Sequence, residues 1–175
     1  MMSAEDFVRI YGEHVPRLCV DTAVIGPDDG CDVVSYTRDF APIFSMMRNL
    51  INGVALKERD EKPRLGQWGL PGGTMFKGEH PFDASKRIIK VELSIEIEPI
   101  GSIGFMWFPN EERQMKVDGM MRDFVIDSCS IVIIARAQSS AIKSPKGKNV
   151  GWFKSSPPVE HEIHTPFLKA RGLLS

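Results

Sequence analysis

Residues 68–95 read WGLPGGTMFKGEHPFDASKRIIKVELSI and decide the fold. The first three letters predict a short strand, because the proline that follows Leu70 biases that residue toward an extended conformation. The segment 81–94 predicts a helix, since proline suits the first turn of a helix. Between them, the pair Gly72-Gly73 lets the backbone approach a ligand closely. The stretch therefore predicts a strand, a ligand-binding loop and a helix in succession.

A loop of this kind is suited to phosphate and metal chemistry. Its carbonyl groups can bind a hard cation, and carboxylates on the following helix can add oxygen ligands of the kind that Mg²⁺ or Mn²⁺ prefers when it bridges phosphate oxygens. A basic cluster able to hold a diphosphate precedes the loop and consists of Lys57, Arg59, Lys62 and Arg64. Such a cluster alone usually forms a solvated surface, but its place next to the glycine pair favours substrate binding.

Composition limits the class of protein. The chain has 175 residues, enough for one domain with a substantial core, and its net charge of −1 offers no general attraction for nucleic acid or an anionic membrane. Its three widely spaced cysteines form neither a metal-binding pair nor a disulfide framework, so a reducing cytoplasm fits best. The N-terminal residues include acids where a signal peptide needs an apolar core, and the longest apolar run, 131–135, is too short to cross a bilayer.

Hydrophobic patterning predicts an alternation of strands and helices. A capping pattern at Ser3 indicates a short N-terminal helix, and the tail beyond Pro157 is expected to end in another helix. Strands are predicted at 17–25, 52–59, 68–70, about 99–108, 124–137 and around Trp152. The segment 27–48 reads as an insertion. This order predicts an α/β fold with a mixed sheet sandwiched between helices, in a single domain that covers residues 1–175.

The predicted helix carries a candidate acid beside an apolar stripe. Ala84, Ile88, Val91 and Ile95 recur at helical spacing and are expected to share one buried face. Glu92 lies about 40° from Ile88 around the helix axis, at the edge of that stripe. It can therefore be a rim residue that pairs with a lysine, or a metal ligand that faces the loop.

In this stretch the sequence resembles the Nudix hydrolases, whose box reads G-x5-E-x7-R-E-U-x-E-E-x-G-U with U an aliphatic residue. At the nine defined positions the chain has Gly73, Glu79, Arg87, Ile88, Ile89, Val91, Glu92, Ser94 and Ile95. Six of these fit, and the departures are Ile88, Val91 and Ser94. Six matches in register, after a strand and on a predicted helix, indicate the Nudix fold.

Two of the departures point to one branch of that family. Ile88 and Val91 replace acids that most Nudix enzymes use for metal binding or base catalysis, and the GDP-mannose mannosyl hydrolases resemble this chain in the same departures. Further similarities to the branch outside the box are Glu5-Asp6-Phe7, Asp21, Arg59 and His164. Enzymes of this branch cleave a GDP-hexose at the sugar carbon and release GDP and the inverted sugar.

The resemblance implies roles for individual residues. The Gly72 carbonyl and Glu92 are expected to bind Mg²⁺ (or Mn²⁺), and Glu92 thereby to take part in catalysis. Arg59 is expected to contact the diphosphate and help the leaving group, and Asp21 to contact the substrate. The neighbouring members of the basic cluster, Lys62 and Arg64, are expected to bind substrate as well.

The rest of the motif is expected to be structural. Glu79 and Arg87 should pair and so fix the loop after Gly73 to the helix. The resemblance also implies a homodimer built partly from the N-terminal segment, with a nucleotide sugar as its small-molecule partner and with neither nucleic acid nor a membrane.

One role of the branch has no counterpart at its expected place. The branch has a metal-binding glutamine and a histidine base a few residues before a tryptophan, whereas the loop 144–149 before Trp152 contains no histidine. Without an imidazole or carboxylate near the attacked carbon, water has no general base. The candidates elsewhere are His161, His164, Glu111, Glu112, Asp118 and Asp123. The ordinary interpretation makes the two histidines surface residues and places the four acids on a solvated connection.

Three functions follow. The first is a Mg²⁺-dependent hydrolase of a nucleoside diphosphate sugar, and the second is a Nudix hydrolase that attacks phosphorus, with a base from residues 111–123. The third is a catalytically silent domain that binds a nucleotide or a protein. A histidine or carboxylate that converges on Glu92 would favour an enzyme, and a cleft with Glu92 alone would favour a binder. The three tryptophans, Trp68, Trp107 and Trp152, are expected in the core or lining a groove.

Overall fold

The computed structural model describes residues 17–27, 53–60, 64–117, 120–144 and 147–175. The side chains of 113–117 and 121–124 fall outside this description. So do the predicted N-terminal helix, residues 28–48 of the predicted insertion, Lys62 and Asp118.

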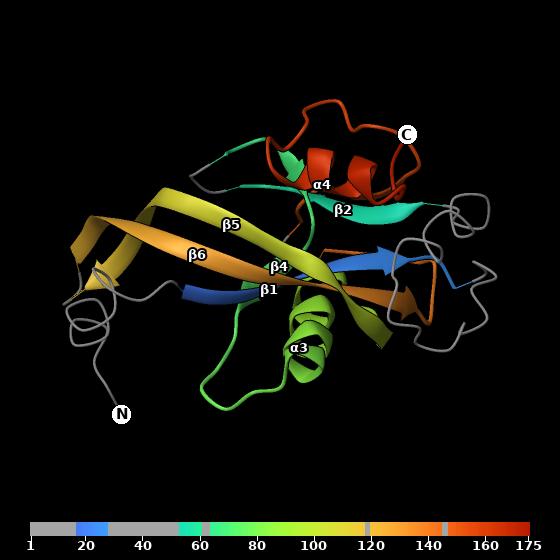
Figure 1. Ribbon diagram of the computed structural model, residues 1–175, viewed down its shortest axis with the longest axis horizontal. Helices are drawn as coiled ribbons and strands as arrows, with labels where there is room; N and C mark the ends of the chain where they lie inside the picture. The colour runs from blue at the N-terminus through green and yellow to red at the C-terminus, as the bar shows by residue number, and fades with distance from the viewer. Residues whose placement is uncertain (1–16, 28–52, 61–63, 118–119, 145–146) are drawn as a thin grey trace.

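Within the described residues, seven strands form one mixed sheet that has a helix on each side (Figure 1). The strands are β1 (Arg17–Ile25), β2 (Val54–Glu58), β3 (Trp68–Gly69), β4 (Gly72–Thr74), β5 (Ile97–Val117), β6 (Met120–Ala137) and β7 (Val150–Phe153). The helices are α3 (Pro81–Leu93) and α4 (His164–Ala170). This architecture confirms the predicted α/β fold with a mixed sheet between helices.

The sheet has the order β3-β2-β1-β6-β5, with β4 also paired to β1 and β7 to β2. The β1–β6 pair is parallel and the other ladders are antiparallel. Strand β1 and the last part of β6, residues 131–137, lie in the middle of the sheet and are largely buried on both faces, which explains their nearly continuous apolar sequences.

The sheet separates the apolar core into two layers. On the α4 side, Ala23 and Ile25 of β1 pack with Leu168. On the α3 side, Val24 packs with Ile89, because successive strand residues point to opposite faces. Each large aliphatic side chain that is fully buried stabilises the fold by about 1.5–3 kcal/mol.

Helix α3 buries part of the predicted stripe, namely Ala84 and Ile88, and extends its buried face in another direction. Its buried residues are Ala84, Ser85, Ile88, Ile89 and Leu93, whereas Val91 is 56% exposed. The prediction of a stripe through Val91 was therefore wrong, and Ile89 and Leu93 contact the sheet instead. The helix ends at Ser94, which adopts a left-handed conformation (φ 56°), so Ile95 is buried from beyond the helix.

The connection predicted between the strands near 99–108 and 124–137 is wrong as well. Strands β5 and β6 continue through it as a long two-stranded ribbon that extends beyond the helices (Figure 1). Polar side chains fit such a ribbon because both of its faces can meet water. The ladder shifts register between Phe108 and Glu111, so Glu111 lies on a strand next to an irregularity.

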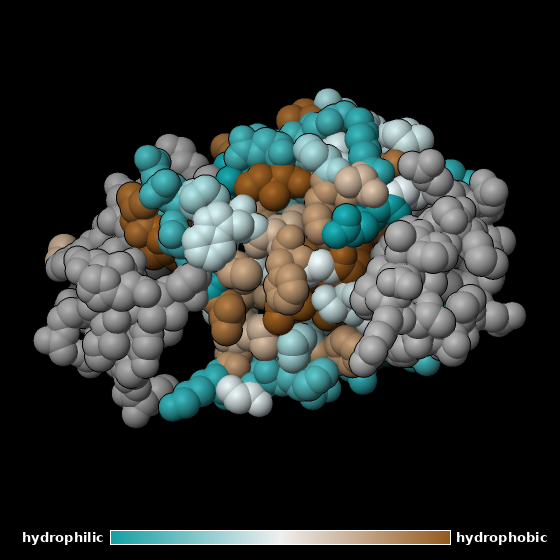
Figure 2. All heavy atoms as spheres, viewed as in Figure 1, coloured by the Kyte–Doolittle hydropathy of each residue, from teal (hydrophilic) through white to brown (hydrophobic). Residues whose placement is uncertain are grey.

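The tryptophans divide between core and surface. Trp68 and Trp152 are partly buried and pack against the two core layers, as expected. Trp107 is 48% exposed and therefore does not lie in the core. Figure 2 shows apolar residues gathered at the centre of the viewed face, with polar residues toward its margins. None of the described helices has the length and apolar character needed to cross a membrane.

Candidate functional site

The site lies where two strands diverge beside β1. Strand β4 pairs with β1 at Cys19–Asp21, whereas β2 pairs with β1 at Ile25. The pocket at this divergence has a volume of about 250 Å³. Its charged lining consists of four cationic side chains, Arg17, Lys57, Arg59 and Lys148, and four acidic ones, Asp21, Asp60, Glu92 and Glu111.

Asp21 and the glycine loop are in direct contact. Asp21 is opposite Gly72 in the ladder, and a side chain at Gly72 would overlap Asp21 Oδ1 and come within 2.8 Å of the Val20 carbonyl oxygen. Glycine is therefore required at this position for Asp21 to point along the pocket wall. The neighbouring Gly73 is less constrained, since its nearest contact would be Ile88 Cδ1 at 3.5 Å.

Glu92 reaches the same glycine from α3. Its Oε2 accepts a hydrogen bond from the Gly72 amide (3.3 Å), and its Oε1 accepts one from Lys57 Nζ (2.6 Å). Glu92 therefore shows both features considered from the sequence, an ion pair with a lysine and a position at the loop. Asp21 and Glu92 meet at Gly72 from opposite elements.

These residues fit a magnesium ion held by few protein ligands. Among the described residues, no three histidine, cysteine or acidic side chains come together as a metal site. Mg²⁺ is commonly bound by one or two carboxylates together with substrate phosphates and water, so a full protein cage is not required. The oxygen donors available here are the Gly72 carbonyl and the carboxylates of Glu92 and Asp21.

The electrostatics of Asp21 favour a cation nearby. Burial is the main cause that raises the pKa of the Asp21 carboxyl to about 6, and the negative charges of Glu92 and Glu111 raise it further. The Ser130 hydroxyl and the positive charge of Arg59 partly oppose the rise. A bound cation would relieve the repulsion among these carboxylates.

Glu79 and Arg87 join the loop after Gly73 to α3. Arg87 donates from Nε to Glu79 Oε1 and from Nη2 to Glu79 Oε2, each at 2.7 Å, and from Nη2 to the Thr74 carbonyl at 3.1 Å. Glu79 Oε2 also accepts from the Phe76 amide (2.8 Å). The hydrogen bonds from Arg87 lower the pKa of Glu79 to about 2. This bidentate pair holds the loop against the helix.

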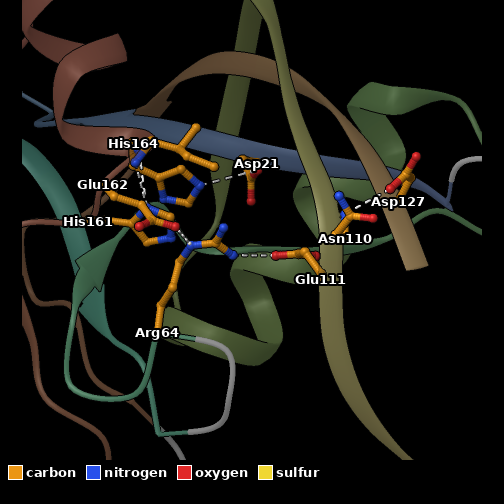
Figure 3. Close-up of polar contacts among 9 residues, drawn as sticks. Asp21, Arg64, Asn110, Glu111, Asp127, His161, Glu162 and His164 are labelled. Carbon is orange, nitrogen blue, oxygen red and sulfur yellow. Dashed lines mark hydrogen bonds and ion pairs between the residues drawn. The ribbon is translucent and has the colours of Figure 1, made fainter. Parts of the chain in front are cut away.

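The basic cluster does not act as one group in the structure. Lys57 and Arg59 line the pocket, and Lys62 lies outside the described residues. Arg64 is directed toward two acids instead, with Nη1 at 2.5 Å from Glu111 Oε1 and Nε at 2.7 Å from Glu162 Oε1 (Figure 3). Its role as a substrate ligand stays a prediction.

The loop before Trp152 supplies a cation that the sequence did not suggest. Lys148 lines the pocket and its Nζ lies 2.6 Å from Asp60 Oδ1. No motif singled out Lys148, because its position depends on the pairing of β7 with β2. Arg17, Cys19, Phe108 and Ser128 are further lining residues that were not predicted.

The interpretation of His161 and His164 as surface residues was wrong. Their exposed fractions are 0% and 2%, and their rings stack at 3.9 Å between centroids (Figure 3). His164 Nδ1 accepts a hydrogen bond from the Leu70 amide (2.8 Å), and Nε2 lies 3.7 Å from Asp21 Oδ2. A side chain at Gly69 would come within 2.5 Å of His164 Nδ1, so a glycine in β3 makes room for the imidazole.

The acidic residues of the ribbon differ in their exposure to solvent. Glu111 is 4% exposed and lines the pocket, so a solvated connection was the wrong interpretation for this residue. Its neighbour Glu112 is exposed, as expected of a strand residue on the other face. The side chain of Asp123 and all of Asp118 lie outside the described residues.

Comparisons with known proteins support the fold. A scan against models of known protein families finds no match. Over 71 residues the chain is 32% identical to the low-salt glycan biosynthesis protein Agl8 of Haloferax volcanii, a match that covers 41% of this chain and 45% of that protein. The chain therefore spans less than half the length of that relative.

Solved structures give the wider likeness. A MutT NUDIX hydrolase from Burkholderia pseudomallei is similar with a TM-score of 0.54 and 21% identity, over 89% of this chain and 97% of that one. A NUDIX family hydrolase from Clostridium perfringens is similar with a TM-score of 0.51 and 14% identity, over 91% and 99% of the two chains. The chain has the Nudix fold.

Proposed function

We propose that this protein is a Mg²⁺-dependent hydrolase of a nucleoside diphosphate sugar, which it converts to a nucleoside diphosphate and a free sugar. The observation that carries the proposal is the meeting of Asp21 and Glu92 at Gly72, in a pocket that also holds several cations. A second carboxylate beside Glu92 is the feature that favours an enzyme over a silent binding domain.

The cationic side of the pocket suits the diphosphate. Lys57, Arg59 and Lys148 line it, and guanidinium and ammonium groups bind phosphate oxygens strongly where water is partly excluded. The Gly72 carbonyl and Glu92 would hold Mg²⁺, which supplies charge neutralisation for the departing diphosphate. Arg59 would stabilise the same leaving group by hydrogen bonding, and Lys57 would exchange Glu92 for a phosphate oxygen.

Attack at the sugar carbon needs a group that orients water and accepts its proton. The acidic residues Asp21 and Glu111 both line the pocket. Glu111 is engaged by Arg64 at 2.5 Å, whereas Asp21 points along the wall next to Gly72. We therefore assign to Asp21 the role of orienting the attacking water and accepting its proton. The partial match to a protein named for glycan biosynthesis is compatible with a substrate that carries a sugar.

Glu111 supports a second function. Its buried carboxylate could instead serve as the base for attack at phosphorus in another nucleoside diphosphate derivative. Its place in the pocket is what favours this alternative. A silent nucleotide-binding domain is favoured by the Lys57–Glu92 ion pair, which neutralises the proposed metal ligand.

Hydrolysis in ¹⁸O-labelled water separates the three functions. The protein is incubated with Mg²⁺ and GDP-mannose, GDP-glucose or other nucleotide sugars, and the products are analysed by mass spectrometry. Label in the sugar is the expected result, and label in the phosphate would reject attack at carbon. Absence of turnover for every substrate, with nucleotide affinity unchanged in Glu92→Gln, would leave the silent binder.

Two further expectations from the sequence remain proposals. The homodimer can be tested by sedimentation equilibrium of the full chain. The cytoplasmic location can be tested by fractionation of cells that express it.

A further inference from the structure

His164 lines the pocket, and its ring stacks on the buried ring of His161. His161 and His164 are almost parallel, with an interplanar angle of 5°, and the Phe108 ring meets both at nearly right angles (89° and 86°). His161 Nδ1 accepts hydrogen bonds from the amides of Ile163 and His164 (3.2 Å each), which fixes the first turn of α4. His161 therefore supports His164 both by ring stacking and through the hydrogen bond from the His164 amide.

The hydrogen bond from Leu70 determines where the proton of His164 resides. His164 Nδ1 accepts the Leu70 amide, so this nitrogen carries no hydrogen. A neutral imidazole has one N–H, which must then be on Nε2. His164 is therefore a hydrogen-bond donor toward the pocket and has no free lone pair with which to act as a base.

The donor on His164 faces Asp21. Nε2 is buried and has no hydrogen-bond partner among the described residues. Asp21 Oδ2 lies 3.7 Å away, within an ångström of hydrogen-bonding distance (Figure 3). A buried N–H donor needs an acceptor, and the Asp21 carboxylate is the acceptor that the described contacts place beside it.

We infer that His164 is the positioning residue for Asp21: its Nε2–H holds the carboxylate against the Gly72 side of the pocket, where the carboxylate meets water and substrate. The same imidazole accepts a hydrogen bond from the amide of Leu70, two residues before Gly72. The His164 side chain therefore links the glycine loop to Asp21. The inference deepens the proposed hydrolase function and rests on it.

Kinetics of three variants test the role. His164→Leu keeps the bulk of the side chain and removes both nitrogens, and His164→Gln returns an amide donor. Thr165→Val is the matched control, because Thr165 is the next residue of α4, is buried and has a hydroxyl without a hydrogen-bond partner among the described residues.

We expect His164→Leu to lower kcat by about 10- to 100-fold, as loss of a supporting hydrogen bond typically does. We expect KM to change less than about threefold, because the diphosphate contacts are elsewhere, and His164→Gln to recover part of kcat. Thr165→Val should match the wild type. An unchanged kcat in a folded His164→Leu protein, or a loss confined to KM, would overturn the inference.

Nitrogen-15 NMR of the imidazoles tests the same contact without any turnover. In the wild type, His164 should be neutral with its proton on Nε2, and its Nε2 resonance should shift in Asp21→Asn. A proton on Nδ1, or no response to Asp21→Asn, would overturn the inference even if His164→Leu fails to fold. If the protein turns over substrate but the Nε2 resonance does not behave in this way, the inference is contradicted and the proposed hydrolase function is not. If the resonance behaves as expected but no substrate is turned over, the proposed hydrolase function is contradicted and the contact between His164 and Asp21 is established.

Discussion

Asp21 and Gly72 face each other across the β1–β4 ladder so closely that no side chain fits at position 72. The contact joins two parts of the chain that the sequence separates by fifty residues, and it defines the wall of the pocket. Neither Gly72 nor its neighbour Gly73 has a positive φ among the described residues, so the requirement at position 72 is one of space and not of backbone conformation.

The first prediction follows from this contact. Gly72→Ala should displace Asp21 or the loop and lower the free energy of unfolding by about 1–3 kcal/mol, the usual effect of overpacking. Turnover should fall with it, because the Asp21 carboxylate moves. Gly73→Ala is the matched control, since its nearest contact would be an ordinary 3.5 Å to Ile88. Urea unfolding of the two variants measures the difference, and equal losses would contradict the steric argument.

The second prediction concerns pH. Burial above all raises the pKa of Asp21 to about 6 from 3.8, so folding favours the protonated carboxyl. The contribution of Asp21 to the free energy of unfolding is fully present below about pH 4 and is lost as pH rises through 6. The loss amounts to about 3 kcal/mol, because each pKa unit corresponds to about 1.36 kcal/mol. Asp21→Asn cannot ionise and should therefore be more stable than the wild type at pH 8, by about 1–3 kcal/mol after loss of its polar contacts.

The advantage of Asp21→Asn should shrink as pH is lowered from 8 to 4.5. The buried histidines have lowered pKa values, so they destabilise the fold as pH falls below their usual 6.5, with the opposite sign. Because His164 Nε2 lies 3.7 Å from Asp21 Oδ2, its contribution differs between the two proteins, and the comparison is therefore repeated in the His164→Leu background. A constant difference for Asp21→Asn would show that its carboxyl is not perturbed.

Much of the fold can be predicted from sequence because it depends on local patterns. Apolar alternation gives β1 at the predicted bounds, 17–25, and the proline signal gives α3 within a residue. The ribbon was missed because the polar residues after Phe108 lack a strand pattern, although they pair regularly with β6. The pairing with β6 stabilises the strand conformation of these residues, although their local propensity does not indicate a strand.

The site was predicted less completely than the fold. The motif named Gly72 and Glu92, which the structure brings together. It did not indicate that His164 reaches Asp21, because the α4 contact spans most of the chain and depends on the space left by Gly69. Lys148 was missed for the same reason, since its loop reaches the pocket only through the pairing of β7 with β2.

The third prediction concerns the Glu79–Arg87 pair. Arg87→Lys keeps the charge but cannot form the two parallel hydrogen bonds, so the melting temperature and the turnover should both fall. The pKa of Glu79 is lowered to about 2, so the pair stabilises the fold above about pH 4.5 and loses this effect as pH falls toward 2. The difference in melting temperature between wild type and Glu79→Gln should accordingly decline between pH 5 and pH 3. A difference that grows on acidification would contradict the pair's contribution.

The fourth prediction tests the metal site through stability. Glu92 meets the Gly72 amide and Lys57, and a bound Mg²⁺ with GDP would replace Lys57 as its partner. A ligand that binds the folded state stabilises it by RT ln(1 + [L]/Kd), about 2.7 kcal/mol at a hundredfold excess over Kd. Mg²⁺ with GDP should thus raise the melting temperature of the wild type clearly, and of Glu92→Gln much less.

Glu96→Gln supplies the comparison for that experiment. Glu96 lies just beyond α3 and pairs with Lys90 in an exposed ion pair away from the pocket. Its variant should keep the full response to Mg²⁺ and GDP, and EDTA should remove the metal-dependent part in both proteins. If Glu92→Gln and Glu96→Gln respond alike, Glu92 does not bind the ion, and the metal role would have to pass to Asp21 or to the substrate phosphates alone.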